Sequence, residues 1–150
     1  CKQASENIIP DLVSGPVEKG TANLDFQNWA ILGEDSVTAA RAALAASVQN
    51  RMWQFVENFY ADQGTENSGY VTDDFLKDIA EKAGVPDIEK WEEDRDDPRW
   101  DQTLLNIDNR ASGLGLSGTP SFAIRGSDGN LEVAPANSAD ALIKAINQAQ

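Results

Sequence analysis

The chain holds one strongly nucleophilic side chain, the thiol of Cys1, and it contains no histidine. A chain without histidine cannot carry a Ser-His-Asp triad, a histidine metal site or an imidazole acid–base pair. A single cysteine cannot form an internal disulfide bond. A cysteine at the first position also suggests that the protein extends upstream of it or is processed there.

Acidic residues form the second candidate for chemistry, in the run from Glu92 to Asp97 that only Arg95 interrupts. Carboxylates in such a run could bind calcium. The run lacks, however, the spaced ligands and the central glycine of a calcium-binding loop. We therefore favour the solvated end of a helix over a calcium site, and we expect no metal site elsewhere.

Charge and composition limit the classes of protein to which the chain can belong. The 150 residues include 12 basic and 25 acidic side chains, which gives a net charge of −13. Because phosphate binding needs clustered lysine and arginine, this balance argues against a nucleic-acid partner. A content of 41% hydrophobic residues is sufficient for one sizeable core. No run of 18 apolar residues and no signal-peptide pattern is present, so we expect no membrane span.

Apolar spacing predicts a helix and a strand in the first 30 residues. Residues 2–13 show helical spacing, and Pro10 predicts a kink because proline removes one backbone donor. Ser14-Gly15-Pro16 should then break or bend this helix. Over residues 22–29 apolar and polar side chains alternate, which predicts a half-buried strand.

Two helices are predicted in the next part of the chain. Between Ser36 and Tyr60 apolar residues recur every three or four positions, so we expect one long amphipathic helix, with a break allowed, that Asp35 or Ser36 caps. A second helix should begin after Thr72 and end at Gly84. The large apolar side chains of the long helix should share one buried face: Leu44, Val48, Met52, Phe55 and Phe59.

Two more helices, a hairpin and a final helix are predicted in the last part of the chain. Asp87 should cap a short helix, and Asp97-Pro98 should begin a longer one. Short strands at 121–124 and 131–133 flank a turn and predict a β-hairpin. A cap at residues 137–138 should then begin the final helix.

The pattern of elements indicates one α/β domain, because no repeat or linker divides the chain. Residues 36–113 would form a helical block inserted between two sheet-bearing parts, 1–35 and 114–150. Three predicted strands make a thin sheet for this much helix. A further strand upstream of residue 1 would complete it.

Segments at both ends of the chain resemble one protein family. The segment 113–124, in which Gly118-Thr119-Pro120 precedes an apolar strand, resembles the part of thioredoxin-fold proteins that delivers a cis-proline beside the active-site cysteines. Cys1-Lys2, followed by a kinked helix and a strand, resembles the region after the second cysteine of DsbA-like thiol–disulfide oxidoreductases, especially those of Gram-positive and actinobacterial envelopes. Gly-Thr-Pro also occurs in ordinary turns, but together with Cys1 and the element order it is specific.

The helical block resembles the same family. Residues 36–43, 52–55 and 76–84 are similar to its inserted helical domain, so the resemblance covers essentially the whole chain. It implies a thioredoxin-like α/β fold with an inserted α-helical domain, whose first sheet strand is missing from this chain. The nucleophilic cysteine of the Cys-x-x-Cys motif and the dipeptide between the two cysteines would also lie upstream of residue 1.

The resemblance implies roles for three residues. Cys1 would be the second cysteine of Cys-x-x-Cys, which attacks the mixed disulfide formed by a cysteine three residues upstream. Cys1 has two other interpretations, an ordinary thiol at the chain start and the lipid-modified first residue of a bacterial lipoprotein. Thr119 and Pro120 would be joined by a cis bond that presents the Thr119 backbone to an extended substrate, whereas Pro120 is otherwise a plain proline before a strand.

The implied function is the donation of disulfide bonds to secreted or cell-envelope proteins by an extracytoplasmic enzyme. Its partners would be reduced or misoxidised protein substrates and a redox partner that reoxidises it, with no cofactor and with membrane contact only through an N-terminal anchor. A chain with one thiol cannot complete a dithiol cycle, so the activity is expected of a longer form. The alternative is a lipid-anchored, non-catalytic thioredoxin-like module that binds peptides, and the residues upstream of Cys1 distinguish the two.

Overall fold

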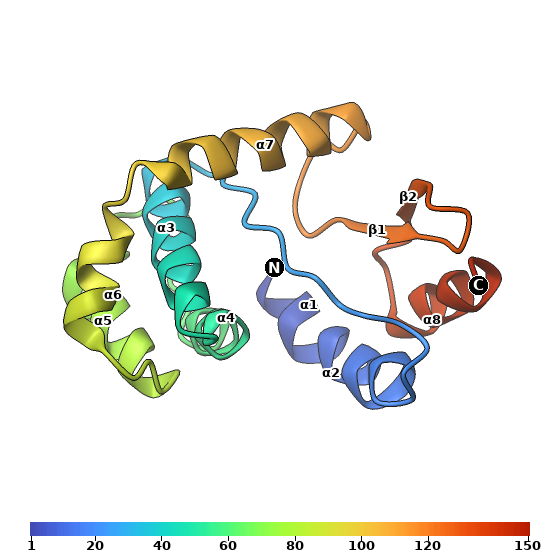
Figure 1. Cartoon of the computed structure of the whole chain (residues 1–150), viewed down its shortest axis with the longest axis horizontal. Coiled ribbons are helices and arrows are strands. Elements are labelled where there is room, and N and C mark those ends of the chain that lie inside the picture. The colour runs from blue at the N-terminus through green and yellow to red at the C-terminus, as the bar shows by residue number, and fades with distance from the viewer. The chain divides into compact units, whose positions relative to one another are not determined.

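The computed structural model describes the whole chain, residues 1–150 (Figure 1). The residues cluster into two compact units. The terminal unit contains Cys1–Asp25 and Ala111–Gln150, and the helical unit contains Phe26–Arg110. The chain therefore passes between the units twice, after Asp25 and after Arg110. Residues 26–35 cluster with the helical unit, whereas the sequence pattern places them with the part that contains Cys1.

The terminal unit begins with three short helical segments. They are α1 (Lys2–Asn7), α2 (Ile9–Leu12) and the π-helical segment η1 (Val13–Val17). Ile8 separates α1 from α2, directly before the turn that contains Pro10. The predicted kink is therefore confirmed.

At Ser14-Gly15-Pro16, where a break or a bend is predicted, the α-helix ends at Leu12 and the chain continues as the wider turn of η1. The N–H of Glu18 donates to the Val13 carbonyl at 2.9 Å, a bond that spans five residues as in a π-helix. Pro16 has no N–H, and its ring excludes the usual bond to the carbonyl four residues earlier. The wider turn thus accommodates a buried proline that an α-helix would not.

A β-hairpin and one helix complete the terminal unit. Strands β1 (Phe122–Arg125) and β2 (Leu131–Ala134) pair antiparallel, with Phe122 opposite Ala134 and Arg125 opposite Leu131. Helix α8 (Ala139–Gln148) begins at Ser138, whose hydroxyl accepts from the N–H of Ala141 at 3.2 Å. The predicted hairpin and the cap of the final helix are confirmed.

The predicted strand over 22–29 is wrong, because this segment is extended but pairs with no other strand. Its side chains do alternate, since Asn23 and Asp25 are exposed while Leu24 and Phe26 are half-buried. The alternation of apolar and polar side chains indicates which side of the backbone is buried. A β-strand also needs a neighbouring strand to which it hydrogen-bonds. The sheet therefore has two strands instead of the predicted three.

Two helices replace the predicted long helix in the helical unit. They are α3 (Glu34–Val48) and α4 (Met52–Ala61). Between them Asn50 adopts φ of 58°, a left-handed conformation that asparagine tolerates better than most residues, and the chain leaves the helical path. Neither Asp35 nor Ser36 caps α3, because the helix already begins at Glu34, after Gly33.

Two features of the structure favour glycine at position 33. Its φ is 84°, in the left-handed region that side chains with a Cβ disfavour. A Cβ at this position would also overlap the side chain of Asn67, which belongs to the loop between α4 and the next helix. The Asp35 carboxylate accepts from the Gly69 N–H of the same loop at 2.8 Å. The start of α3 and this loop therefore hold each other in place.

Three further helices follow: α5 (Asp73–Lys82), α6 (Ile88–Arg95) and α7 (Arg99–Gly113). The Thr72 hydroxyl accepts from Phe75 N–H at 3.2 Å and the Asp87 carboxylate accepts from Lys90 N–H at 2.9 Å, so both predicted caps are confirmed. None of the helices in the chain has the length and apolar character needed to span a membrane.

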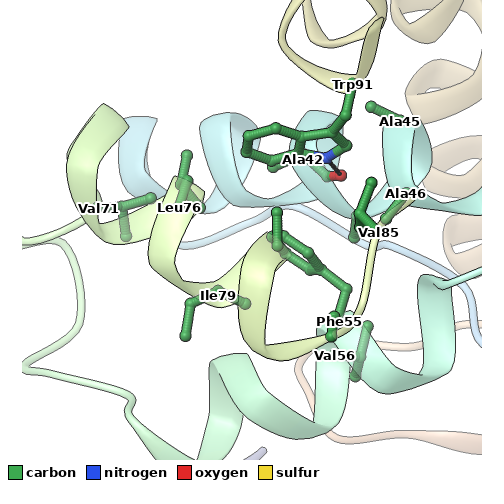
Figure 2. Close-up of a cluster of buried hydrophobic side chains, with 13 residues drawn as sticks. Ala42, Ala45, Ala46, Phe55, Val56, Val71, Leu76, Ile79, Val85 and Trp91 are labelled. Atoms are coloured by element: carbon green, nitrogen blue, oxygen red, sulfur yellow. Dashed lines mark hydrogen bonds between the residues drawn. The ribbon is translucent and has the colours of Figure 1, made fainter. Parts of the chain in front are cut away.

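The core of the helical unit surrounds two aromatic rings (Figure 2). Phe55 of α4 and Trp91 of α6 are 1% and 0% exposed, and their ring centroids lie 6.0 Å apart. The Trp91 indole donates to the Ala42 carbonyl at 2.9 Å. Leu76 and Ile79 of α5 are also fully buried.

The buried face of α3 agrees with the predicted one at Leu44, which is 8% exposed, but not at Val48. Val48 is 45% exposed, because the break at Asn50 ends the face that was expected to continue into α4. Small side chains of α3 also pack in the core, where α6 lies against α3. These residues are Ala42, Ala43, Ala45 and Ala46.

Candidate active site

Cys1 is half-buried and immediately precedes α1. Its carbonyl accepts from the Ser5 N–H at 3.0 Å and so closes the first turn of the helix. The thiol is free, as it must be in a chain with one cysteine. Cys1 is thus held at the start of a helix in the terminal unit.

Thr119 and Pro120 lie in the same terminal unit, in the loop that joins α7 to β1. Helix α7 ends where the Leu116 N–H donates to the Ala111 carbonyl at 3.0 Å and Gly115 adopts φ of 70°. The loop then leads to a cis Thr119–Pro120 peptide bond. The structure therefore places the three predicted site residues, from opposite ends of the chain, in one compact unit.

The backbone polar groups of Thr119 have no partner within the chain. Neither its N–H nor its carbonyl makes a hydrogen bond within the chain, and the adjacent Pro120 is exposed. Backbone polar groups need a partner, which is water in the free protein. An extended peptide could therefore replace water here without breaking any internal bond.

Ser121 closes the turn that contains Thr119 and Pro120. Its hydroxyl donates to the Gly118 carbonyl at 2.5 Å, across the two residues between them. From the sequence, Ser121 is predicted only to begin a strand. The preference of serine for hydrogen bonds to nearby backbone groups is the sequence feature that indicates this contact.

The loop that carries these residues is uncharged. No lysine, arginine, aspartate or glutamate occurs between Arg110 and Arg125. Contacts made here would therefore depend on backbone hydrogen bonds and shape, and not on the charge of the substrate.

No group of three or more cysteine, aspartate or glutamate side chains is placed to hold a metal ion. In the acidic run, Asp94 is not a solvated side chain as predicted, since it is only 8% exposed. Its carboxylate pairs with the Lys90 ammonium at 2.8 Å, and Asp97 accepts from the Arg99 N–H at 2.9 Å. The run therefore includes structural contacts at the junction of α6 and α7.

A family model described as a DSBA-like thioredoxin domain matches residues 17–147. The chain belongs to this family. The matched range includes Thr119 and Pro120, while Cys1 lies before it. Two curated relatives share 26% identity over 151 residues, spanning 99% of this chain and 67% of their own length. Both are described as probable disulfide bond formation protein D, one from Bacillus cereus and one from Bacillus anthracis.

Two solved structures share the fold of this DsbA-like chain. A thioredoxin-like oxidoreductase from Silicibacter pomeroyi DSS-3 has 26% identity and a TM-score of 0.72, over 99% of this chain and 80% of its own. Oxidised BdbD from Bacillus subtilis has a TM-score of 0.76 at 19% identity, over 99% and 79% of the two chains. These matches confirm the predicted resemblance and the thioredoxin-like DsbA fold. They also confirm the predicted class of enzyme, a thiol–disulfide oxidoreductase.

Proposed function

We propose that this DsbA-like protein exchanges disulfide bonds through a Cys-x-x-Cys motif whose second cysteine is Cys1. The position of Cys1 directly before α1, in the same unit as Thr119–Pro120, supports this role. The curated relatives are longer than this chain, which leaves room for an upstream cysteine. The family match, combined with a single thiol in this position, is the observation that carries the proposal.

In the donating direction, the oxidised motif holds a disulfide between Cys1 and the upstream cysteine. A substrate thiolate attacks the upstream sulfur, and the Cys1 thiolate leaves as a mixed disulfide forms. A second substrate thiolate then attacks the substrate sulfur of that mixed disulfide and releases the upstream thiolate. The substrate loses two electrons and two protons, and the motif gains them. In the reverse direction, the Cys1 thiolate attacks the mixed disulfide.

The Thr119 backbone binds the substrate segment next to the reacting sulfur. Its unpaired N–H and carbonyl are the groups that an extended peptide uses when it adds to a strand. The bond from Ser121 to Gly118 holds the turn in the conformation that presents them. Side chains of the substrate contribute little charge recognition, because the loop is uncharged.

The substrates are reduced or misoxidised secreted and cell-envelope proteins, and the enzyme works outside the cytoplasm. The names of the curated relatives support disulfide formation in preference to reduction. A separate redox partner accepts the two electrons and restores the disulfide, since the motif itself is regenerated only by a thiol oxidant.

The test compares this 150-residue chain with an extended form that adds the upstream residues and their Cys-x-x. We expect the extended form to oxidise a reduced test protein when a disulfide reagent regenerates it, and the 150-residue chain to show no turnover. Equal turnover by both forms would refute the role of the upstream cysteine. Peptide binding at the Thr119 loop without any exchange by the extended form would instead establish a non-catalytic binding module.

A further inference from the structure

The turn of the β-hairpin contains the one Asp-Gly pair in the sequence, Asp128-Gly129. In such a pair the backbone nitrogen of the glycine can attack the side-chain carboxyl of the aspartate, because the glycine has no Cβ that obstructs the approach. Both residues are exposed, so water reaches the peptide bond between them. The turn therefore brings together the two groups and the solvent that this reaction needs.

The reaction rearranges the backbone without any change of oxidation state. The Gly129 nitrogen forms a bond to the carboxyl carbon of Asp128, the carboxyl O–H group and the N–H proton leave together as water, and a cyclic succinimide results. One water molecule then opens the ring at either of its carbonyls. Opening at one carbonyl restores aspartate. Opening at the other gives isoaspartate, in which the backbone runs through the former side chain.

Asn130 holds the carboxylate of Asp128 with two hydrogen bonds. The backbone N–H of Asn130 donates to Oδ1 at 2.9 Å, and its side-chain amide donates to Oδ2 at 2.7 Å. The backbone bond and then the side-chain bond lower the pKa of Asp128 from its ordinary value. An ionised carboxylate resists attack, because it has no O–H group that can leave as part of water. Asn130 therefore keeps the carboxyl group in its unreactive form and fixes its orientation.

The attacking nitrogen is held as well. The Gly129 N–H donates to the Gly126 carbonyl at 3.0 Å. On the other side of the same residue, the Gly129 carbonyl accepts from the Arg125 guanidinium at 2.7 Å. Ring closure requires the nitrogen to give up its bond to Gly126 while the carboxyl carbon moves toward it. Hydrogen bonds on both reacting groups therefore oppose the rearrangement.

We propose that Asp128-Gly129 is a site of isoaspartate formation and that Asn130 slows this reaction in the folded protein. The reactivity belongs to the dipeptide, and the protection belongs to the folded turn. Loss of the Asn130 side chain frees one carboxylate oxygen, and unfolding of the turn frees both reacting groups. The inference concerns the hairpin alone and does not depend on the proposed role of Cys1.

Isoaspartate would disturb the contacts that the turn makes, because it adds one carbon to the backbone. The Gly126 N–H donates to the Asn130 carbonyl at 3.1 Å, across the altered position. The Ser127 N–H donates to the Ala149 carbonyl at 2.8 Å, directly after α8. The modification would thus lengthen a turn that closes the hairpin and also contacts the end of the final helix.

The test incubates the folded 150-residue protein in water enriched in heavy oxygen. Each passage through the succinimide introduces one heavy oxygen at residue 128, and mass spectra of the digested protein locate the label and measure its rate. Asn130→Ala removes the side-chain bond, and Asn130→Asp replaces the amide donor with a carboxylate of nearly the same size. The matched control, Ser127→Ala, changes an exposed side chain of the same turn and leaves both Asn130 bonds in place.

We expect folded Asn130→Ala to take up label about fivefold faster than the parent, the factor that corresponds to the loss of one exposed hydrogen bond. Asn130→Asp should also be faster, and Ser127→Ala should match the parent. In guanidinium chloride, where the turn is unfolded, all four proteins should take up label at similar rates that exceed the rate of the folded parent.

Three results would overturn the proposal. The first is the parent rate in both folded Asn130 variants, and the second is an equal acceleration in Ser127→Ala. The third is a folded parent that takes up label as fast as the unfolded one, or an unfolded chain that takes up none. Circular dichroism shows which variants fold, and Asn130→Asp decides the matter if Asn130→Ala does not.

Discussion

The helical unit and the terminal unit are built in different ways. The helical unit encloses large side chains, with Phe55, Trp91, Leu76 and Ile79 fully buried. The terminal unit contains two four-residue strands, the short segments α1, α2 and η1, and the ten-residue helix α8. Leu142 is its largest fully buried side chain. The charge differs as well, since 18 acidic and eight basic residues give the helical unit −10, while seven acidic and four basic residues give the terminal unit −3.

We expect the two units to contribute differently to stability and to disulfide exchange. Burial of large apolar side chains is the main source of folding free energy, and it is concentrated in the helical unit. The free thiol and the unpaired backbone of Thr119 are in the terminal unit. Substitutions in the first unit should therefore change stability, and substitutions near Thr119 should change exchange.

The largest expected effect is that of Phe55→Ala. The ring is 1% exposed, so its removal should lower the free energy of unfolding by about 3–5 kcal/mol. The matched control, Leu105→Ala on α7, removes a side chain that is 52% exposed and should change the free energy by less than about 0.5 kcal/mol. Urea unfolding of both variants measures the difference, and equal midpoints would contradict the assignment of the core.

The second effect is a loss of stability at high pH that depends on Tyr60. Burial, Tyr70 and Glu66 raise the pKa of Tyr60 to about 12. The unfolded chain releases this proton near pH 10, so the folded state binds more protons between pH 10 and 12 and its stability falls as the pH rises. In Tyr60→Phe, the free energy of unfolding should therefore fall by about 2 kcal/mol less between pH 10 and 12 than it does in the parent. Urea unfolding at several pH values measures this difference. If the free energy of unfolding falls equally steeply in the parent and in Tyr60→Phe between pH 10 and 12, the prediction is wrong.

The third effect concerns a helix cap in the helical unit. Thr72→Ala removes the hydroxyl that accepts from Phe75 N–H, and should cost about 1 kcal/mol of the free energy of unfolding. Ser36→Ala is the control, since Ser36 lies within α3 and caps nothing. Thermal unfolding should separate the two variants. If Ser36→Ala is the more destabilising, the start of α3 has been placed wrongly.

The smallest effect on stability should come from Ser121→Ala in the terminal unit. The bond to Gly118 is exposed, so its loss should cost about 1 kcal/mol or less. Exchange with a peptide substrate should nevertheless slow several-fold in the extended form, through a higher KM, because the turn no longer holds Thr119. Ser121→Thr, which keeps a hydroxyl, should restore the rate, and Ser117→Ala should leave it unchanged. An unchanged KM in Ser121→Ala would contradict the role of Ser121 in holding the turn.

Features that depend on neighbouring residues were predictable from the sequence. The hydroxyl of Thr72 and the carboxylate of Asp87 satisfy N–H groups three residues later, so residue type and spacing are sufficient to predict both caps. The hairpin follows from two short apolar runs around a turn. The loop with Thr119–Pro120 was singled out by resemblance to a family, and not by any local physical rule.

Features that depend on distant partners were not predictable. The segment 22–29 alternates like a strand, but nothing in its own residues reveals whether a neighbouring strand exists. The break between α3 and α4 depends on Asn50 adopting a conformation that is permitted to asparagine but not required of it. The hydrogen bond from the Trp29 indole to the Asp108 carboxylate joins residues 79 positions apart, and no spacing rule connects them.

The most direct test of the central claim uses Cys1→Ser in the extended form. The reduced variant, with its upstream thiolate, is mixed with a disulfide-bonded peptide, and the products are measured by intact mass. If Cys1 is the resolving cysteine, the upstream sulfur forms a mixed disulfide with the peptide that persists in Cys1→Ser and resolves in the parent. No accumulation of the mixed disulfide, or turnover by Cys1→Ser at the rate of the parent, would contradict the role of Cys1.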